Sequence, residues 1–111
     1  MIVVTGSVVA KPDCIDEMLA FSLDHVRRSR GEPGCISHAV SRDAENPLRL
    51  VFVEEWADRD ALQAHFALPA SRGFVKVLAA FAAEAPSMQI YEVDAVECGQ
   101  APGLGSKGSA A

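Results

Sequence analysis

Cysteine is scarce in this chain, and the few cysteines are not paired in sequence. The 111 residues contain three, at Cys14, Cys35 and Cys98, so the number is odd and no CxxC pair occurs. Disulfide frameworks use even numbers of cysteines, and cysteine zinc sites use closely spaced ones. We therefore expect free thiols in a reducing, cytoplasmic compartment, rather than a disulfide frame or a zinc site.

The chain also lacks an excess of basic residues and long apolar runs. Its formal net charge is −5, and its one basic cluster, Arg27, Arg28 and Arg30, would complement the negative end of a predicted helix. A nucleic-acid surface is therefore not expected. No apolar stretch is long enough to cross a membrane, and residues 1–12 lack the basic start and apolar run of a signal peptide. We expect neither nucleic-acid nor membrane partners.

Several familiar catalytic motifs are missing as well. The sequence holds no phosphate-binding loop, no nucleophile–base pair and no cluster of metal ligands at usable spacing. It therefore predicts no metal site. The length suits one domain, which we assign to residues 1–98. Residues 99–111 are rich in Gly, Ser and Ala and are predicted to form a flexible tail.

The hydrophobic pattern predicts four strands and three helices. A helix of about 18 residues begins near Pro12 and ends before Gly31, with acidic residues early and arginines late. The order is β-α-β-β-α-β with a broken second helix, which predicts an α+β, ferredoxin-like fold with a four-stranded antiparallel sheet. The predicted strands are 2–10, 35–42, 48–56 and 88–96, and the two later helices are 59–66 and 72–85, the last capped by Ser71.

Both faces of the predicted sheet are largely apolar. In residues 48–53, Leu48, Leu50 and Phe52 alternate with Arg49, Val51 and Val53. A strand that is exposed on one face should alternate apolar and polar residues, and this one does not. We expect helices to cover one face and a second copy of the sheet to cover the other, which gives a homodimer.

One strand-to-helix corner, residues 51–66, carries polar residues where packing alone would prefer aliphatic ones. Phe52, Glu54 and Trp56 share one face of the strand, and His65 lies on the helix that follows. If this helix folds back over the sheet, Trp56 and His65 can line one cavity. The corner itself is expected to be held by Glu54 as a hydrogen-bond acceptor and by Asp58 as a helix N-cap, while Met18 or Phe21 and Val77 or Phe81 could supply apolar walls.

The chain resembles the antibiotic biosynthesis monooxygenase family of quinol-monooxygenase-like, dimeric α/β barrels. The resemblance covers about residues 1–97 and is carried by EPGCISH at 32–38, DAENP at 43–47 and FVEEWADRDALQAHF at 52–66. It implies a cofactor-independent monooxygenase that oxidises a small aromatic molecule, such as a phenol, hydroquinone or naphthol, with dioxygen. It also leaves three alternatives: a haem-degrading enzyme, an isomerase of a phosphorylated sugar derivative, or a dimeric ligand-binding protein without turnover.

The resemblance and the residue chemistry together suggest roles for the corner residues. His65 is the expected catalytic base, and the alternative is a core or exposed histidine. The expected substrate-binding residues are Trp56, Phe52, Phe81 and Met18, and no cofactor is expected. The face on which His38 lies is left open, and His25, beside the arginines, is expected to be solvated. The first strand offers Thr5, Gly6 and Ser7 but no Asn, which ranks haem degradation below quinol oxidation.

Overall fold

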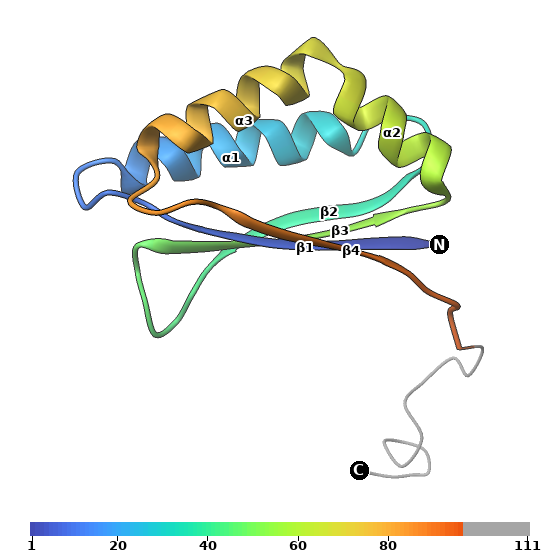
Figure 1. Cartoon of the computed structure of the whole chain (residues 1–111), viewed down its shortest axis with the longest axis horizontal. Helices are drawn as coiled ribbons and strands as arrows, with labels where there is room; N and C mark the ends of the chain where they lie inside the picture. The colour runs from blue at the N-terminus through green and yellow to red at the C-terminus, as the bar shows by residue number, and fades with distance from the viewer. Residues whose placement is uncertain (97–111) are drawn as a thin grey trace, which may run out of the picture.

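A computed structural model describes residues 1–96 of the chain (Figure 1). The predicted tail, 99–111, and the predicted end of the domain at 98 lie outside these residues. In residues 1–96, no helix combines the length and apolar character that crossing a bilayer requires. The elements in chain order are β1 (Ile2–Val9), α1 (Ile15–Ser29), β2 (Cys35–Arg42), β3 (Arg49–Trp56), α2 (Arg59–Ala67), α3 (Pro69–Phe81) and β4 (Ser87–Glu92).

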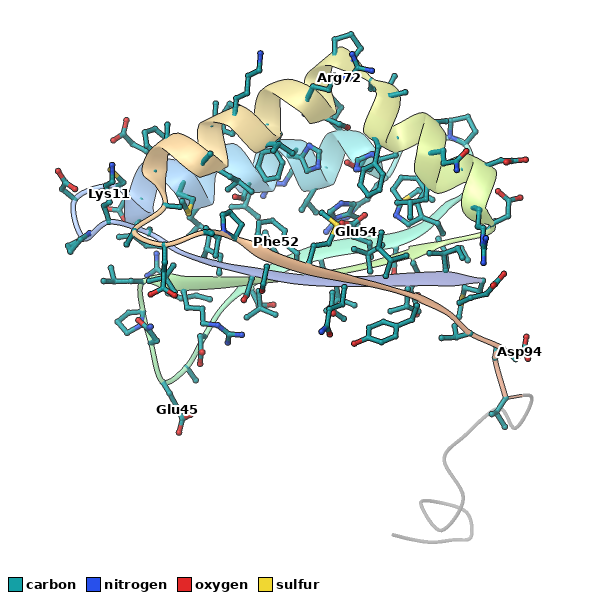
Figure 2. All side chains as sticks on the ribbon, in the orientation of Figure 1. Lys11, Glu45, Phe52, Glu54, Arg72 and Asp94 are labelled. Atoms are coloured by element: carbon teal, nitrogen blue, oxygen red, sulfur yellow. The ribbon has the colours of Figure 1, made fainter. Side chains whose placement is uncertain are left out.

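The four strands form one antiparallel sheet in the order β2-β3-β1-β4, and all three helices lie on the same face (Figure 1). This confirms the predicted ferredoxin-like α+β fold. The even-numbered residues of β3, Leu50 to Trp56, are buried under the helices. Phe52 and Glu54 accordingly point from the sheet toward the helix layer (Figure 2). The odd-numbered residues of β3 point to the opposite face of the sheet, which none of the three helices covers (Figure 1). A homodimer through this face remains a prediction.

The last helix differs from its predicted bounds. Pro69 was predicted to end α2, but it also begins α3. Proline is favoured in the first helical turn, because the backbone N–H that it lacks would have no hydrogen-bond partner there and its fixed φ suits the helix. Ser71 is therefore inside the helix and buried, and it is not the cap. The helix ends at Phe81 instead of residue 85. The next residue, Ala82, forms an isolated antiparallel β-bridge with Ala10.

The buried apolar residues form two clusters. The larger one joins α1, α3 and the ends of β1 and β3 that are near the hairpin turn, and includes Met18, Phe52 and Phe74. The smaller one lies below α2 and includes Val4 and Trp56. Helix α1 contributes Met18 and Val26 to the larger cluster. They lie on its inner face, where the buried residues recur at helical spacing: Met18, Ser22, His25, Val26 and Ser29.

The position of α2 depends on two local features. Asp58 adopts extended backbone geometry and its Oδ1 accepts a hydrogen bond from the Ala61 amide at 2.8 Å, which confirms it as the N-cap. Gly34 has a φ of +81°, and a side chain there would place its Cβ 2.5 Å from the Ala61 Cβ. Gly34 thus lets the start of β2 approach the first turn of α2, and this approach sets where His65 lies.

Candidate functional site

A cavity of about 750 Å³ lies between the helix layer and the sheet. Its walls are mainly apolar and come from β1, β3 and α3. The lining residues that are exposed belong to α3, including Arg72 and Lys76, and to residues 86–88 at the start of β4, so the cavity opens between these two segments. The deeper lining includes Val4, Val8, Phe52, Phe74 and Leu78, together with His25, His38, Glu54 and His65.

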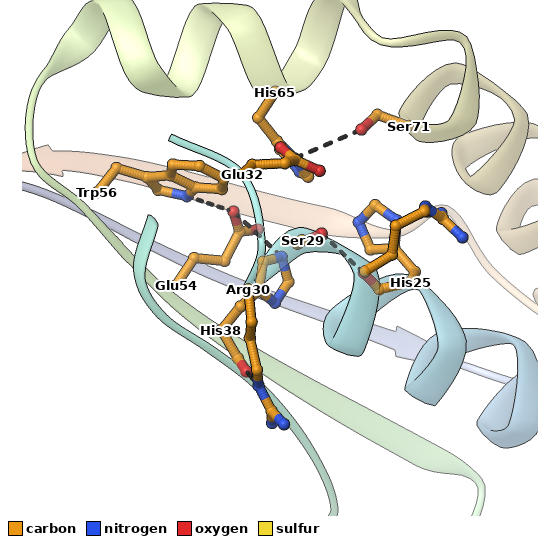
Figure 3. Close-up of polar contacts among 10 residues, drawn as sticks. His25, Ser29, Arg30, Glu32, His38, Glu54, Trp56, His65 and Ser71 are labelled. Carbon is orange, nitrogen blue, oxygen red and sulfur yellow. Dashed lines mark hydrogen bonds and ion pairs between the residues drawn. The ribbon is translucent and has the colours of Figure 1, made fainter. Parts of the chain in front are cut away.

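All three histidines of the chain meet at the inner end of this cavity (Figure 3). His25 comes from α1, His38 from β2 and His65 from α2, and they are only 4%, 2% and 3% exposed. One ring nitrogen from each lies within 4.8 Å of the other two. The sequence suggested no metal-ligand cluster because these residues are far apart along the chain, yet the fold assembles one.

His25 is buried, which corrects the prediction that it is solvated. Its ring stacks on Phe74 with centroids 3.9 Å apart, and Arg28 Nη2 donates to its Nδ1 at 3.2 Å. Burial, followed by the imidazoles of His38 and His65 and the Arg28 guanidinium, lowers the pKa of His25 from 6.5 to about 3. The signal was present in the sequence, because His25 follows Ser22 by three residues on the apolar stripe of α1.

His38 faces the helices, which answers the question that the sequence left open. It pairs across the β2–β3 ladder with Glu54, and its Nε2 lies 3.4 Å from Glu54 Oε1. Neither ring nitrogen of His38 makes a hydrogen bond within residues 1–96. Burial first, then His65 and Arg30, lowers the pKa of His38 to about 4, so its close approach to Glu54 involves a neutral ring.

His65 is held from the side by a residue that the sequence analysis did not single out. Glu32, in the loop between α1 and β2, places Oε1 2.7 Å from His65 Nδ1, and Ser71 Oγ lies 3.4 Å from the same nitrogen. A carboxylate can only accept, so the Nδ1–H donates to Glu32 and leaves Nε2 as the unprotonated nitrogen of the neutral ring. In the sequence, Glu32 appeared only as the first residue of the stretch EPGCISH, which carried the family resemblance but assigned no role to this residue.

Glu54 and Trp56 form a buried pair behind the histidines. The Trp56 Nε1–H donates to Glu54 Oε1 at 2.8 Å, and the indole is 4.7 Å from the His65 ring, measured between centroids. Burial raises the pKa of Glu54, against the opposing effects of the Trp56 hydrogen bond and His65. Glu54 therefore lies at the polar end of the cavity and also fixes the indole.

The structure separates the predicted substrate-binding residues into two groups. Phe52 lines the cavity. Trp56, which is fully buried, is not among the lining residues and backs His65 instead. Met18 and Phe81 pack in the larger apolar cluster and are likewise outside the lining. The predicted base, His65, does line the cavity. Ser71, which was predicted only as a helix cap, and Phe74, which was not among the predicted site residues, line it as well.

Comparison with known proteins identifies the family. The model of the antibiotic biosynthesis monooxygenase family matches residues 1–77. The chain belongs to this family. A crystal structure of an antibiotic biosynthesis monooxygenase is 28% identical, with a TM-score of 0.79, and the match covers 86% of this chain and all of that one. The motifs that carried the resemblance, at 32–38, 43–47 and 52–66, all lie within the matched residues.

Two further relatives extend the comparison. The uncharacterized protein sll1783 of Synechocystis is 36% identical over 92 residues, which is 83% of this chain and 63% of that protein, so the match spans less than two thirds of the relative. A protein from Deinococcus radiodurans shares the fold with a TM-score of 0.84 at 21% identity, over 91% of this chain and 100% of that one. Neither of these two relatives identifies a substrate.

Proposed function

We propose that the protein is a cofactor-independent monooxygenase that oxidises a small aromatic molecule, of the phenol, hydroquinone or naphthol class, with dioxygen. The observation that carries the proposal is the apolar cavity whose inner end gathers His65, His38 and Glu54. Its volume of about 750 Å³ is in the range of small-molecule sites. Membership of the antibiotic biosynthesis monooxygenase family supports the same class of reaction.

The proposed base is His65. Its Nδ1–H is bound by the Glu32 carboxylate at 2.7 Å, which fixes the ring and leaves Nε2 able to take a proton. The same arrangement of carboxylate and imidazole orients general bases in other enzymes. Phe52 and Phe74 offer flat apolar walls to an aromatic ring whose hydroxyl points at His65. Trp56, Met18 and Phe81 support this site from one layer further out.

After His65 has removed the proton, the remaining steps of the proposed reaction need no further catalytic group. His65 removes the phenolic proton, and the anion gives one electron to dioxygen. The two radicals combine at a ring carbon that bears hydrogen, and the resulting peroxide loses water to leave a quinone carbonyl. One dioxygen is consumed and one water is released, and the substrate supplies all four electrons. The buried cavity helps by excluding bulk water from the anion.

Oxygen uptake by metal-free protein tests this proposal. We expect uptake on a panel of hydroquinones and naphthols, with one quinone formed per dioxygen after autoxidation is subtracted. His65→Ala should lower the rate by roughly 100-fold or more, as loss of a general base does. Arg59→Ala is the matched control on the same helix, because its ion pair with Glu92 is exposed and contributes little to stability. Full turnover in His65→Ala would remove the base role, and no uptake by folded wild type would favour a passive binding protein.

We also propose a homodimer through the uncovered face of the sheet. Val53 and Tyr91 are 44% and 45% exposed there, and Val53 is central, between Thr5 of β1 and Ala39 of β2. A soluble protein seldom leaves such side chains bare. Light scattering after size exclusion should give twice the chain mass, and Val53→Arg should shift it toward one chain mass. A monomeric wild type at micromolar concentration would exclude this interface.

A further inference from the structure

We propose that the histidine cluster of His25, His38 and His65 is a binding site for a divalent transition metal such as Zn²⁺ or Co²⁺. The three imidazoles would be the protein ligands, and the remaining coordination positions would face the cavity. This inference concerns metal binding alone and does not depend on the oxygenase proposal, because it is measured without substrate.

The first argument is geometric. Three ring nitrogens that lie within 4.8 Å of one another have a central point about 2.8 Å or less from each, and zinc–histidine bonds are about 2.0–2.1 Å long. Each nitrogen therefore has to move inward by under about 1 Å, which small rotations of the side chains allow. Three histidines with open positions on one side form the ligand set of a catalytic type of zinc site.

The second argument is the unmet hydrogen-bonding capacity of His38. Its ring is 2% exposed, and neither nitrogen has a hydrogen-bond partner in residues 1–96. Buried polar atoms are nearly always paired, and an exception calls for a specific explanation such as a bound ion. A metal at the centre of the cluster would supply the missing partner for one of these nitrogens.

The third argument is the surrounding charge. Glu54 is 7% exposed, and in the described part of the chain the basic side chains within 4.0 Å of the Glu54 and Glu32 carboxylates are histidines, His38 at 3.4 Å and His65 at 2.7 Å. Within these residues neither carboxylate is paired with a lysine or arginine, so no permanent cation lies at contact distance, and a divalent ion would balance the negative charge. Glu32 also stands in the position of an outer-sphere partner, since it accepts from the Nδ1–H of His65 and leaves Nε2 for the metal.

One contact opposes metal binding and provides a test. Arg28 donates to Nδ1 of His25, which places the proton of the neutral ring on Nε2, the nitrogen that a metal would need. Arg28 is exposed, so it can move away at little cost. Removing its side chain should let His25 carry the proton on Nδ1, and Arg28→Ala is therefore expected to bind the metal more tightly than the wild type.

The experiment uses untagged full-length protein freed of metal with a chelator, titrated with Co²⁺ and then with Zn²⁺. Trp56 is the only tryptophan, and its ring lies 4.7 Å from His65, so its fluorescence reports on this site. We expect saturable quenching at one Co²⁺ per chain, with recovery as Zn²⁺ displaces it. His25→Gln, His38→Gln and His65→Gln should each weaken binding on the order of 100-fold, and Glu54→Gln by roughly tenfold. Arg59→Ala is the control that should leave affinity unchanged.

A second measurement keeps the test sound if a histidine variant misfolds. The wild-type protein labelled with ¹⁵N-histidine has three imidazole spin systems, one for each histidine. We expect one equivalent of Zn²⁺ to shift one nitrogen in all three. Unshifted imidazoles, Co²⁺ binding without quenching of Trp56, or His38→Gln that binds with wild-type affinity would each overturn the site and assign any binding to surface carboxylates.

Discussion

His38 and Glu54 face each other directly across the β2–β3 ladder, with His38 Nε2 3.4 Å from Glu54 Oε1. The same carboxylate oxygen accepts the Trp56 indole N–H at 2.8 Å (Figure 3). Glu54 therefore joins the fold to the site, because it fixes a fully buried indole on one side and meets a histidine of the cavity on the other.

This double role predicts stability losses of different size for two substitutions. Trp56→Phe removes the donor to a buried carboxylate and leaves a void, so it should lower the free energy of unfolding by about 2–4 kcal/mol. Glu54→Gln keeps an acceptor for the indole and removes a buried charge, so it should change stability by less than about 1 kcal/mol. Urea denaturation of both variants at neutral pH measures the difference. Equal destabilisation would mean that the charge of Glu54 is itself needed for folding.

Gly34 and Gly73 provide a matched pair of glycines. At Gly34, φ is +81° and a Cβ would lie 2.5 Å from the Ala61 Cβ, so Gly34→Ala should cost about 2–3 kcal/mol. At Gly73, inside α3, a Cβ meets nothing within 4 Å, so Gly73→Ala should stabilise by up to about 1 kcal/mol. Thermal unfolding compares them. A neutral Gly34→Ala would show that α2 can shift freely away from β2.

The fold was predictable because its elements follow hydrophobic periodicity. The apolar run of β3 and the N-cap at Asp58 are local signals, and the corner 52–66 correctly brought Glu54, Trp56 and His65 together. The cavity lining was less predictable. Trp56 was expected to touch the substrate, yet its indole turns to Glu54 and lies behind His65.

The histidine cluster was missed for a physical reason. Its members lie on three different elements and are assembled only by the β2–β3 register and the docking of α1 and α2. His25 could have been found from its spacing to Ser22, but the neighbouring Arg27 and Arg28 suggested a solvated helix end. Arg28 is exposed while His25 is buried, although they are only three residues apart. The two side chains are neighbours on the helix and in contact, yet only the arginine reaches solvent, so proximity to a charge cluster did not show that His25 is exposed.

The depressed pKa values predict acid sensitivity of the metal-free protein. His25 and His38 have folded-state pKa values of about 3 and about 4, below the ordinary 6.5. Protonation therefore favours the unfolded state, so their contribution to stability is full above pH 6.5 and falls as the pH drops from 6.5 toward 4. One pKa unit is worth about 1.4 kcal/mol, and the two rings together should account for a loss of several kcal/mol by pH 4.

Denaturation at pH 8 and at pH 5 checks this sign. The groups that face the two rings are Glu54, Arg28, Arg30 and His65, and Glu54 alone favours protonation at close range. His38→Gln removes one of the two rings, so it should lose less stability between these pH values than the wild type does. A wild type that is equally stable at both pH values would mean that the rings are already protonated in the fold.

The two proposals predict that Zn²⁺ inhibits oxygen uptake. A metal on His65 Nε2 occupies the lone pair that the proposed base needs, and Zn²⁺ has no redox chemistry with which to replace it. Uptake should fall to the autoxidation rate as the site fills, with half inhibition at the dissociation constant obtained from Trp56 fluorescence, and a chelator should restore it. In His25→Gln, inhibition should need on the order of 100-fold more Zn²⁺. If Zn²⁺ binds at the cluster and uptake continues unchanged, the metal site stands and His65 is not the base.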